Sequence, residues 1–175
     1  MPWLIRETIE ALGKTDNYYC HRRWLFYESV LAFLKEIGVD AITGKLLEVG
    51  VRSVALHHQS TVVESVIRPE LLERHQGEVI LAHMDRPNET HVLGADSFRY
   101  AICCQCFEHM DHPERAWREI KRVTTHGALI TIPWRWPNNT VHNRDMRDLA
   151  AWTDGDVPAK LRTVRGPRLM AWYEF

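Results

Sequence analysis

The chain has 175 residues, of which 45% are hydrophobic and 26% are charged, and its formal net charge at pH 7 is -1. This composition is ordinary for a globular protein, and the near-zero charge offers no basic field to attract nucleic acid or an anionic membrane. No apolar run approaches the roughly 20 residues that span a bilayer, and the N-terminus lacks the apolar core of a secretory signal. We therefore expect a cytoplasmic protein without nucleic-acid or membrane partners.

The length and the cysteines together indicate one domain in a reducing compartment. A chain of 175 residues can bury roughly two-thirds of its unfolded surface around a single core. Cys103, Cys104 and Cys106 lie in one apolar stretch, which does not form a disulfide framework. We predict a single domain with N-terminal helices over residues 1–40 and an α/β core over residues 45–175.

Two helices are predicted before the core. Residues 1–12 have the pattern of a short amphipathic helix, and residues 18–37 carry the longest helical signal in the chain. In the second stretch, apolar residues such as Trp24, Tyr27 and Leu34 recur at intervals of three and four. Gly38 is placed to end this helix.

Two short apolar stretches with an acidic residue near the carboxyl end predict the first two strands. They cover residues 45–50 (KLLEVG) and 61–64 (TVVE), and a brief helix is expected over residues 54–59 between them. Open α/β sheets bind ligands at the edge where such strands end. Glu48 and Glu64 are therefore candidate ligand contacts.

The middle of the chain continues the alternation of helices and strands. Residues 65–74 predict a helix that begins near Pro69, and residues 78–82 predict a third strand. Met84 and Asp85 follow that strand in a turn that contains proline.

A strand–helix–strand unit is predicted next. Residues 99–106 (RYAICCQC) form a buried strand, residues 107–113 a polar loop, and residues 114–123 a helix with Glu119 on its solvent side. Gly127 is placed to supply the left-handed residue that ends this helix, and residues 128–132 form another apolar strand. Two strands joined in this way make a right-handed unit with a parallel sheet.

The C-terminal part predicts the closure of the sheet. After Pro133 comes a loop of aromatic and polar residues, then a helix over residues 146–152 and a turn over residues 154–156. Residues 161–164 and 169–175 have the pattern of two strands joined by a turn. No internal repeat, low-complexity tract or linker is present in the sequence.

The order and spacing of several short motifs resemble a known family. These motifs are Leu47-Glu48-Val49-Gly50, Phe107-Glu108-His109, His112-Pro113, Glu119-Ile120-Lys121-Arg122-Val123 and Ile132-Pro133. Together they are similar to class I S-adenosylmethionine-dependent methyltransferases of the small-metabolite type (type 11-like). The chain departs from the family pattern at Arg99, at residues 124–127, and at Val51-Arg52-Ser53, where the second and third glycines of the first motif are missing.

The resemblance implies a fold and a cofactor. The fold is α/β and Rossmann-like, with a mostly parallel central sheet, a C-terminal antiparallel strand pair and helices on both faces. The cofactor is S-adenosylmethionine, and the partner is a small-molecule substrate. We expect the ends of the first, second and fourth strands to converge on a cleft that holds the adenosyl group.

The resemblance also implies which residues contact the cofactor. The family carries an acid at the end of the second strand that accepts both ribose hydroxyls, which implies this role for Glu64. Asp85 lies about where the family has an acid near the adenine amino group, and we expect Met84 to pack on the adenine ring. The remaining cofactor contacts implied by the resemblance come from the loop after the first strand and from the ends of the second and fourth strands: Glu48, Gly50, Val51, Ser65, Cys104 and Gln105.

Histidines are the candidate catalytic residues. A hydroxyl acceptor benefits from a general base, and histidine suits that role near neutral pH. His142 is the preferred acceptor-side residue, and His109 is the second candidate because it matches the family's Glu-His pair. We predict no metal site, since neighbouring cysteines on a strand point to opposite faces and cannot easily share one ion.

Two functional hypotheses stay open at this point. The first is a methyltransferase that acts on an oxygen or nitrogen of a small molecule or metabolite. The second is a methyltransferase-like domain that has lost cofactor binding and serves as an interaction or regulatory subunit. Arg52 in the degraded glycine motif favours this hypothesis. A homodimer or a complex with a partner subunit is compatible with both. A nicotinamide oxidoreductase is disfavoured because the G-x-G-x-x-G motif is missing.

Overall fold

The computed structural model describes residues 3–12, 19–39, 45–135, 140–164 and 168–175. The helices and strands in these residues are, in chain order, α1 (Arg6–Leu12), α2 (Tyr19–Glu36), β1 (Leu46–Val49), β2 (Thr61–Glu64), α3 (Pro69–Arg74), β3 (Val79–Leu81), α4 (Pro87–Thr90), β4 (Phe98–Cys104), the short 3-10 helix η1 (Phe107–His109), α5 (Pro113–Val123), β5 (Thr124–Pro133), α6 (Met146–Trp152), β6 (Lys160–Val164) and β7 (Arg168–Glu174).

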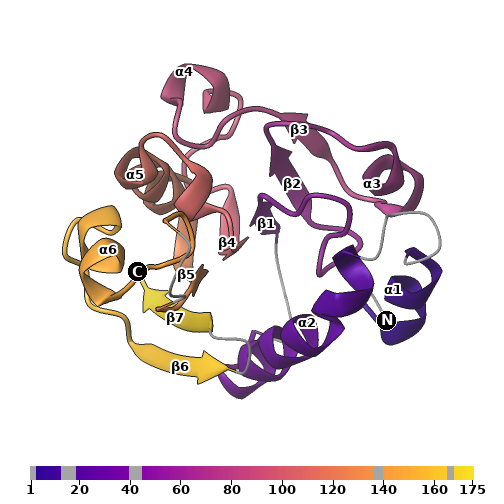
Figure 1. The fold of residues 1–175 in the computed structure, drawn as a ribbon. Helices are drawn as coiled ribbons and strands as arrows, with labels where there is room; N and C mark the ends of the chain where they lie inside the picture. The colour runs from indigo at the N-terminus through magenta and orange to yellow at the C-terminus, as the bar shows by residue number, and fades with distance from the viewer. Residues whose placement is uncertain (1–2, 13–18, 40–44, 136–139, 165–167) are drawn as a thin grey trace.

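The strands form one seven-stranded sheet in the order β3-β2-β1-β4-β5-β7-β6 (Figure 1). Strands β1 to β5 are parallel, whereas β7 runs antiparallel to both β5 and β6. The predicted fold, a mostly parallel sheet closed by a C-terminal antiparallel pair, is confirmed. From β1, the chain adds β2 and β3 on one side of the sheet and then β4 and β5 on the other side. The point where the strand order changes side lies at β1, and such switch points form ligand crevices at the carboxyl ends of the strands.

Helices cover both faces of the sheet (Figure 1). One core lies between the sheet and α5 with α6, and it includes Trp117, Ile120, Leu47, Ile130 and Tyr173. The other lies between the sheet and α1 with α2, and it includes Phe33, Leu34, Leu46, Ile102 and Leu129. Neighbouring residues of one strand therefore belong to different cores, as the two-residue period of a strand requires. Each such side chain contributes roughly 1.5–3 kcal/mol on burial.

The helix predicted over residues 54–59 is wrong. This segment forms turns and a single bridge between Trp3 and His57. The carboxylate of Glu48 explains the difference, because it accepts hydrogen bonds from the backbone N–H groups of Leu56 at 2.7 Å and His57 at 2.9 Å. These donors bind a side chain instead of a helical carbonyl, so the segment wraps around Glu48.

The turn predicted around Gly127 is also wrong. Strand β5 begins at Thr124, directly after α5 ends at Val123, and Gly127 lies inside the strand. A Cβ atom at Gly127 would lie 2.4 Å from the carbonyl oxygen of Tyr173. The glycine is therefore needed for the close approach of β5 and β7, and not for a left-handed backbone.

The predicted solvent exposure of Glu119 is wrong as well, since this side chain is buried on α5. Its carboxylate accepts hydrogen bonds from the Thr90 hydroxyl at 2.8 Å and from the Arg122 guanidinium. A charged side chain is tolerated at this position because these donors replace water. In the described part of the chain, every helix is too short or too polar to cross a bilayer.

Candidate functional site

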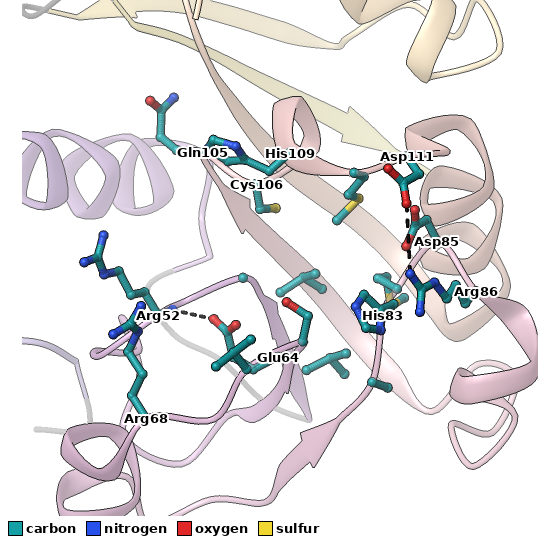
Figure 2. Close-up of a pocket in the computed structure, with 18 of the residues that line it drawn as sticks. Arg52, Glu64, Arg68, His83, Asp85, Arg86, Gln105, Cys106, His109 and Asp111 are labelled. Atoms are coloured by element: carbon teal, nitrogen blue, oxygen red, sulfur yellow. Dashed lines mark hydrogen bonds and ion pairs between the residues drawn. The ribbon is translucent and has the colours of Figure 1, made fainter. Parts of the chain in front are cut away.

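A cavity of about 440 Å³ opens at the carboxyl edge of the sheet (Figure 2). Its walls come from the ends of β1 (Val49, Gly50), β2 (Val63, Glu64) and β4 (Gln105, Cys106), and from the segment 82–86 that follows β3. The predicted convergence of the first, second and fourth strand ends on a cleft is confirmed. The volume lies within the roughly 300–1,000 Å³ range of small-molecule and cofactor pockets.

The turn after β1 contributes Gly50 and Arg52 to the lining of this cavity. Gly50 has a φ of +70°, and a Cβ atom there would lie 2.5 Å from the Cβ of Cys106. Glycine therefore allows the ends of β1 and β4 to meet. Arg52 also adopts a left-handed backbone, with a φ of +62°. Arg52 therefore has the left-handed backbone conformation that glycine adopts most easily, which costs a residue with a side chain on the order of 1–2 kcal/mol.

The carboxylate of Glu64 lies in the wall of the cavity (Figure 2). It accepts a hydrogen bond from the backbone N–H of Arg52, and the residue is only 7% exposed. Burial raises the pKa of Glu64, while the N–H of Arg52 and the nearby Arg68 guanidinium oppose this rise. Ser65, the next residue, also lines the cavity.

Glu48 lies outside this cavity. Its oxygens accept hydrogen bonds from Leu56 N–H, His57 N–H and the Ser60 hydroxyl, and the residue is 1% exposed. Burial raises its pKa to about 7 against the opposing effect of these three donors. Together with Val51 and Cys104, Glu48 borders a separate void of about 20 Å³ on the α2 side of the sheet.

Met84 and Asp85 line the large cavity on the side of β3, and both are buried. Asp85 accepts a hydrogen bond at 3.0 Å from the backbone N–H of His112, the residue that precedes α5. This contact ties the wall of the cavity to the start of the helix. The thioether of Met84 supplies an apolar, polarisable surface beside it.

Gln105 lies at the end of β4 in a left-handed backbone, with a φ of +57°. Its N–H donates to the carbonyl oxygen of Thr131 at 3.0 Å, which holds the turn against β5. The residue lines the cavity and is 7% exposed, yet its side-chain amide nitrogen has no hydrogen-bond partner among the described residues. A buried donor without a partner beside a cavity is well placed to bind a ligand acceptor.

The two candidate catalytic histidines lie together at one side of the cavity. His109 lines it, whereas His142 is not among the lining residues and packs against His109, with 5.6 Å between the ring centroids. Burial lowers the pKa of His109, and His142 and Arg23 add to this effect; burial also lowers the pKa of His142. Both imidazoles are thereby favoured in the neutral form, which can accept a proton.

Several cavity residues were missed by the sequence analysis. They are the cationic side chains Arg23, Arg52, Arg68 and Arg86, together with Cys106 and Asp111. Arg86 and Asp111 approach each other within 4.0 Å at the far end of the cavity from Arg52 (Figure 2). Of the missed residues, only Arg52 had a signal in the sequence, since it stands in the glycine motif; Arg23 reaches the site from α2, far along the chain.

Residues 38–132 match the family described as a methyltransferase domain. Among solved structures, the chain is similar to N-methyltransferase NodS from Bradyrhizobium japonicum in complex with S-adenosylhomocysteine, at 11% identity, 97% coverage of both chains and a TM-score of 0.65. It is also similar to a SAM-dependent methyltransferase from Aquifex aeolicus, at 13% identity, 98% coverage of both chains and a TM-score of 0.60.

A third similar structure is magnesium protoporphyrin IX methyltransferase from Synechocystis with bound S-adenosylhomocysteine, at 11% identity and a TM-score of 0.64, covering 86% of this chain and 82% of that one. At these identities the likeness is one of fold. No curated protein sequence matches the chain significantly.

Proposed function

Because the chain belongs to the methyltransferase domain family, we propose that it transfers a methyl group from S-adenosylmethionine to an oxygen or nitrogen of a small molecule. The observation that carries this proposal is the cavity of about 440 Å³ at the switch point of the sheet, with the buried carboxylate of Glu64 in its wall. Two similar folds, the NodS and protoporphyrin enzymes, hold S-adenosylhomocysteine, which supports the same cofactor for this chain.

Glu64 is the proposed ribose contact. A carboxylate offers two adjacent acceptor oxygens, and two neighbouring ribose hydroxyls can donate to them. Burial raises the pKa of Glu64, but the Arg52 N–H and the Arg68 guanidinium oppose this rise and so support the ionised form, which makes the stronger acceptor. Gly50 and Ser65, which line the cavity next to Glu64, would contact the same nucleoside.

Met84 and Asp85 are the proposed adenine contacts. Both line the cavity beyond Glu64, where Met84 offers an apolar surface to a ring and Asp85 an acceptor to an exocyclic amine. Gln105 is proposed to donate its amide N–H to an oxygen of the cofactor. Glu48, Val51 and Cys104 border the separate small void, so we propose that they support the turn after β1 without touching the cofactor.

The chemistry requires little from the protein besides orientation. Methyl transfer from a sulfonium is an in-line displacement, and holding the two reactants in line is worth up to roughly 7–11 kcal/mol. The acceptor must also lose a proton. His109 lines the cavity, His142 packs against it, and burial favours the neutral form of both, so a ring nitrogen of either is proposed to take that proton.

Calorimetric titration with S-adenosylhomocysteine tests the proposal. We expect a dissociation constant in the micromolar range and one site per chain.

A second candidate function is a non-catalytic interaction or regulatory subunit, and the position of Arg52 in the cavity wall favours it, because this side chain occupies space next to Gly50. If no heat of binding is measured at millimolar S-adenosylhomocysteine, the result supports this second function and rejects the proposed enzyme.

A further inference from the structure

We propose that Glu108, His109 and His142 bind one transition-metal ion at the edge of the cavity. One ligand atom from each of these three side chains lies within 4.8 Å of the other two. Glu108 and His109 are neighbours in η1, which begins three residues after the end of β4, and His142 lies in the segment after β5. The parallel sheet brings these two segments to the same edge. Two imidazoles and one carboxylate form a ligand set that leaves coordination positions open.

The spacing of the three ligands fits an ion after small side-chain rotations. A metal at about 2.0–2.2 Å from each donor needs donors roughly 3–3.5 Å apart. The Nε2 atom of His109 already lies 3.9 Å from the nearer carboxylate oxygen of Glu108. The His109 side chain is 57% exposed and His142 is only partly buried, so both rings have room to turn.

The burial of Glu108 is an independent observation that points to a ligand. Its side chain is 1% exposed, and its Oε2 atom has no hydrogen-bond partner among the described residues. A buried carboxylate oxygen without a donor is costly, and natural proteins rarely leave one unless a ligand or an ion completes it. The other oxygen, Oε1, is the one that lies 3.9 Å from His109 Nε2, so a cation bound by this carboxylate and the two imidazoles would compensate the buried charge.

The surroundings of the site select the kind of ion. Burial raises the pKa of Glu108 to about 7, while the nearby Arg23, Arg144 and Arg168 oppose this rise, and the same arginines repel any cation. Mg²⁺ and Ca²⁺ depend on several oxygen ligands and charge attraction, which a single carboxylate among arginines does not supply. Zn²⁺ and related ions form strong bonds to imidazole, so they can bind despite the positive field. Among the described residues, the cluster of possible ligands consists of Glu108, His109 and His142 and contains no cysteine.

The role of the ion rests on the proposed function. Because His109 lines the cavity, an ion held beside it would have an open position toward a bound acceptor. A hydroxyl or water that coordinates such an ion loses its proton more readily. The two histidines would then hold the ion rather than take the proton, and the acceptor would be one that offers an oxygen or nitrogen ligand.

The test is metal binding by the chelator-stripped protein, measured with Zn²⁺ by competition against a chromophoric chelator and with Co²⁺ by visible absorption. We expect one site of micromolar affinity or better, weakened at least tenfold in His142→Ala and in Glu108→Gln. His91→Ala is the matched control, since His91 is an exposed histidine that belongs neither to the ligand cluster nor to the cavity lining, and its variant should bind as the unmodified protein does. Circular dichroism establishes that each variant is folded, and His109→Ala replaces Glu108→Gln if that buried substitution prevents folding.

Zn²⁺ binding that is unchanged in His142→Ala would show an adventitious surface site and overturn the inference, as would the lack of binding at 100-fold excess of Zn²⁺ over protein. The metal titration needs no cofactor, so its result is separate from the titration with S-adenosylhomocysteine. If Zn²⁺ binds as expected and S-adenosylhomocysteine does not, the metal site stands and only its role at an acceptor falls.

Discussion

Glu48 and Glu64 belong to adjacent parallel strands, and their carboxylates meet different surroundings. In the register of the sheet Glu48 lies beside Val62, so Glu64 stands two residues closer to the carboxyl edge. Glu48 is enclosed by residues 56–60 and binds three donors of its own chain, next to a void of about 20 Å³. Glu64 binds the N–H of Arg52 and faces the cavity of about 440 Å³.

The comparison separates a carboxylate that organises the fold from one that is available to a ligand. The same loop, residues 50–60, donates backbone N–H groups to both acids, so it closes over one and leaves the other at an opening. An acid whose oxygens are used internally has little capacity left for a ligand. We therefore propose that Glu48 stabilises the fold and that Glu64 binds the ligand, and the following substitutions separate these two proposed roles.

Glu64→Ala is expected to have the largest effect. It removes the two charge-assisted hydrogen bonds proposed to the ribose, each worth about 1.5–3 kcal/mol, so the affinity for S-adenosylhomocysteine should fall roughly a thousandfold. The free energy of unfolding should change by less than about 1 kcal/mol. The substitution removes the unfavourable burial of an acid, and this gain offsets the loss of its hydrogen bond to the N–H of Arg52. Calorimetry and urea unfolding measure the two quantities, and unchanged affinity would remove Glu64 from the site.

Glu48→Ala is expected to show the opposite pattern. It leaves the N–H groups of Leu56 and His57 and the hydroxyl of Ser60 without their acceptor, and we expect a loss of about 3 kcal/mol in the free energy of unfolding. The folded fraction should bind S-adenosylhomocysteine within about threefold of the unmodified affinity. A variant that keeps its stability but loses the ligand would reverse the assignment of the two acids.

The behaviour of Glu48 also shows where sequence analysis succeeds and where it stops. Hydrophobic patterns are local, so they predicted the strands and α6, whose N-cap residue Asp145 makes a capping box with Asp148. The carboxylate of Glu48 reaches donors eight and nine residues away. No pattern within residues 54–59 reveals such a contact, and the turn was therefore predicted as a helix.

The candidate site was predictable to a similar extent. Glu64 ends β2, and Met84 and Asp85 follow β3. Parallel strands place their carboxyl ends at one edge, so the presence of these residues in one cavity follows from topology. The contributions of Arg23 and Arg68 depend on how helices and loops pack over that edge, which spacing in the sequence does not determine. The predicted roles of these residues toward a cofactor stay predictions.

A pH titration of stability sharpens the role of Glu48. Its pKa is about 7 in the folded protein and 4.5 in the reference state, so folding takes up a proton between these values. Stability from this group is therefore highest below pH 4.5 and falls as the pH rises to 7. Glu48→Gln removes that fall, and the difference in unfolding free energy between the two proteins should change by about 2 kcal/mol from pH 5 to pH 7.

The unfolding free energy of Glu48→Gln must be subtracted from that of the unmodified protein, because other groups titrate in the same pH range. Burial lowers the pKa of His57 and His75, which makes the folded state more stable as the pH rises, opposite in sign to Glu48. These contributions are largely common to both proteins and mostly cancel in the difference. A flat difference between pH 5 and pH 7 would mean that the three donors keep Glu48 ionised despite its burial.

The smallest expected effect concerns the turn that links the two acids. Gly50→Ala places a Cβ atom 2.5 Å from that of Cys106 in a left-handed backbone, whereas Gly38→Ala meets a left-handed backbone, φ +81°, with no atom within 4 Å. Both variants should lose about 1 kcal/mol from the backbone conformation. Only Gly50→Ala should lose a further amount of about 1 kcal/mol from overpacking, as well as affinity for S-adenosylhomocysteine, because the ends of β1 and β4 must separate. Equal losses in stability, with equal affinities, would show that the close contact at Gly50 has no part in shaping the cavity.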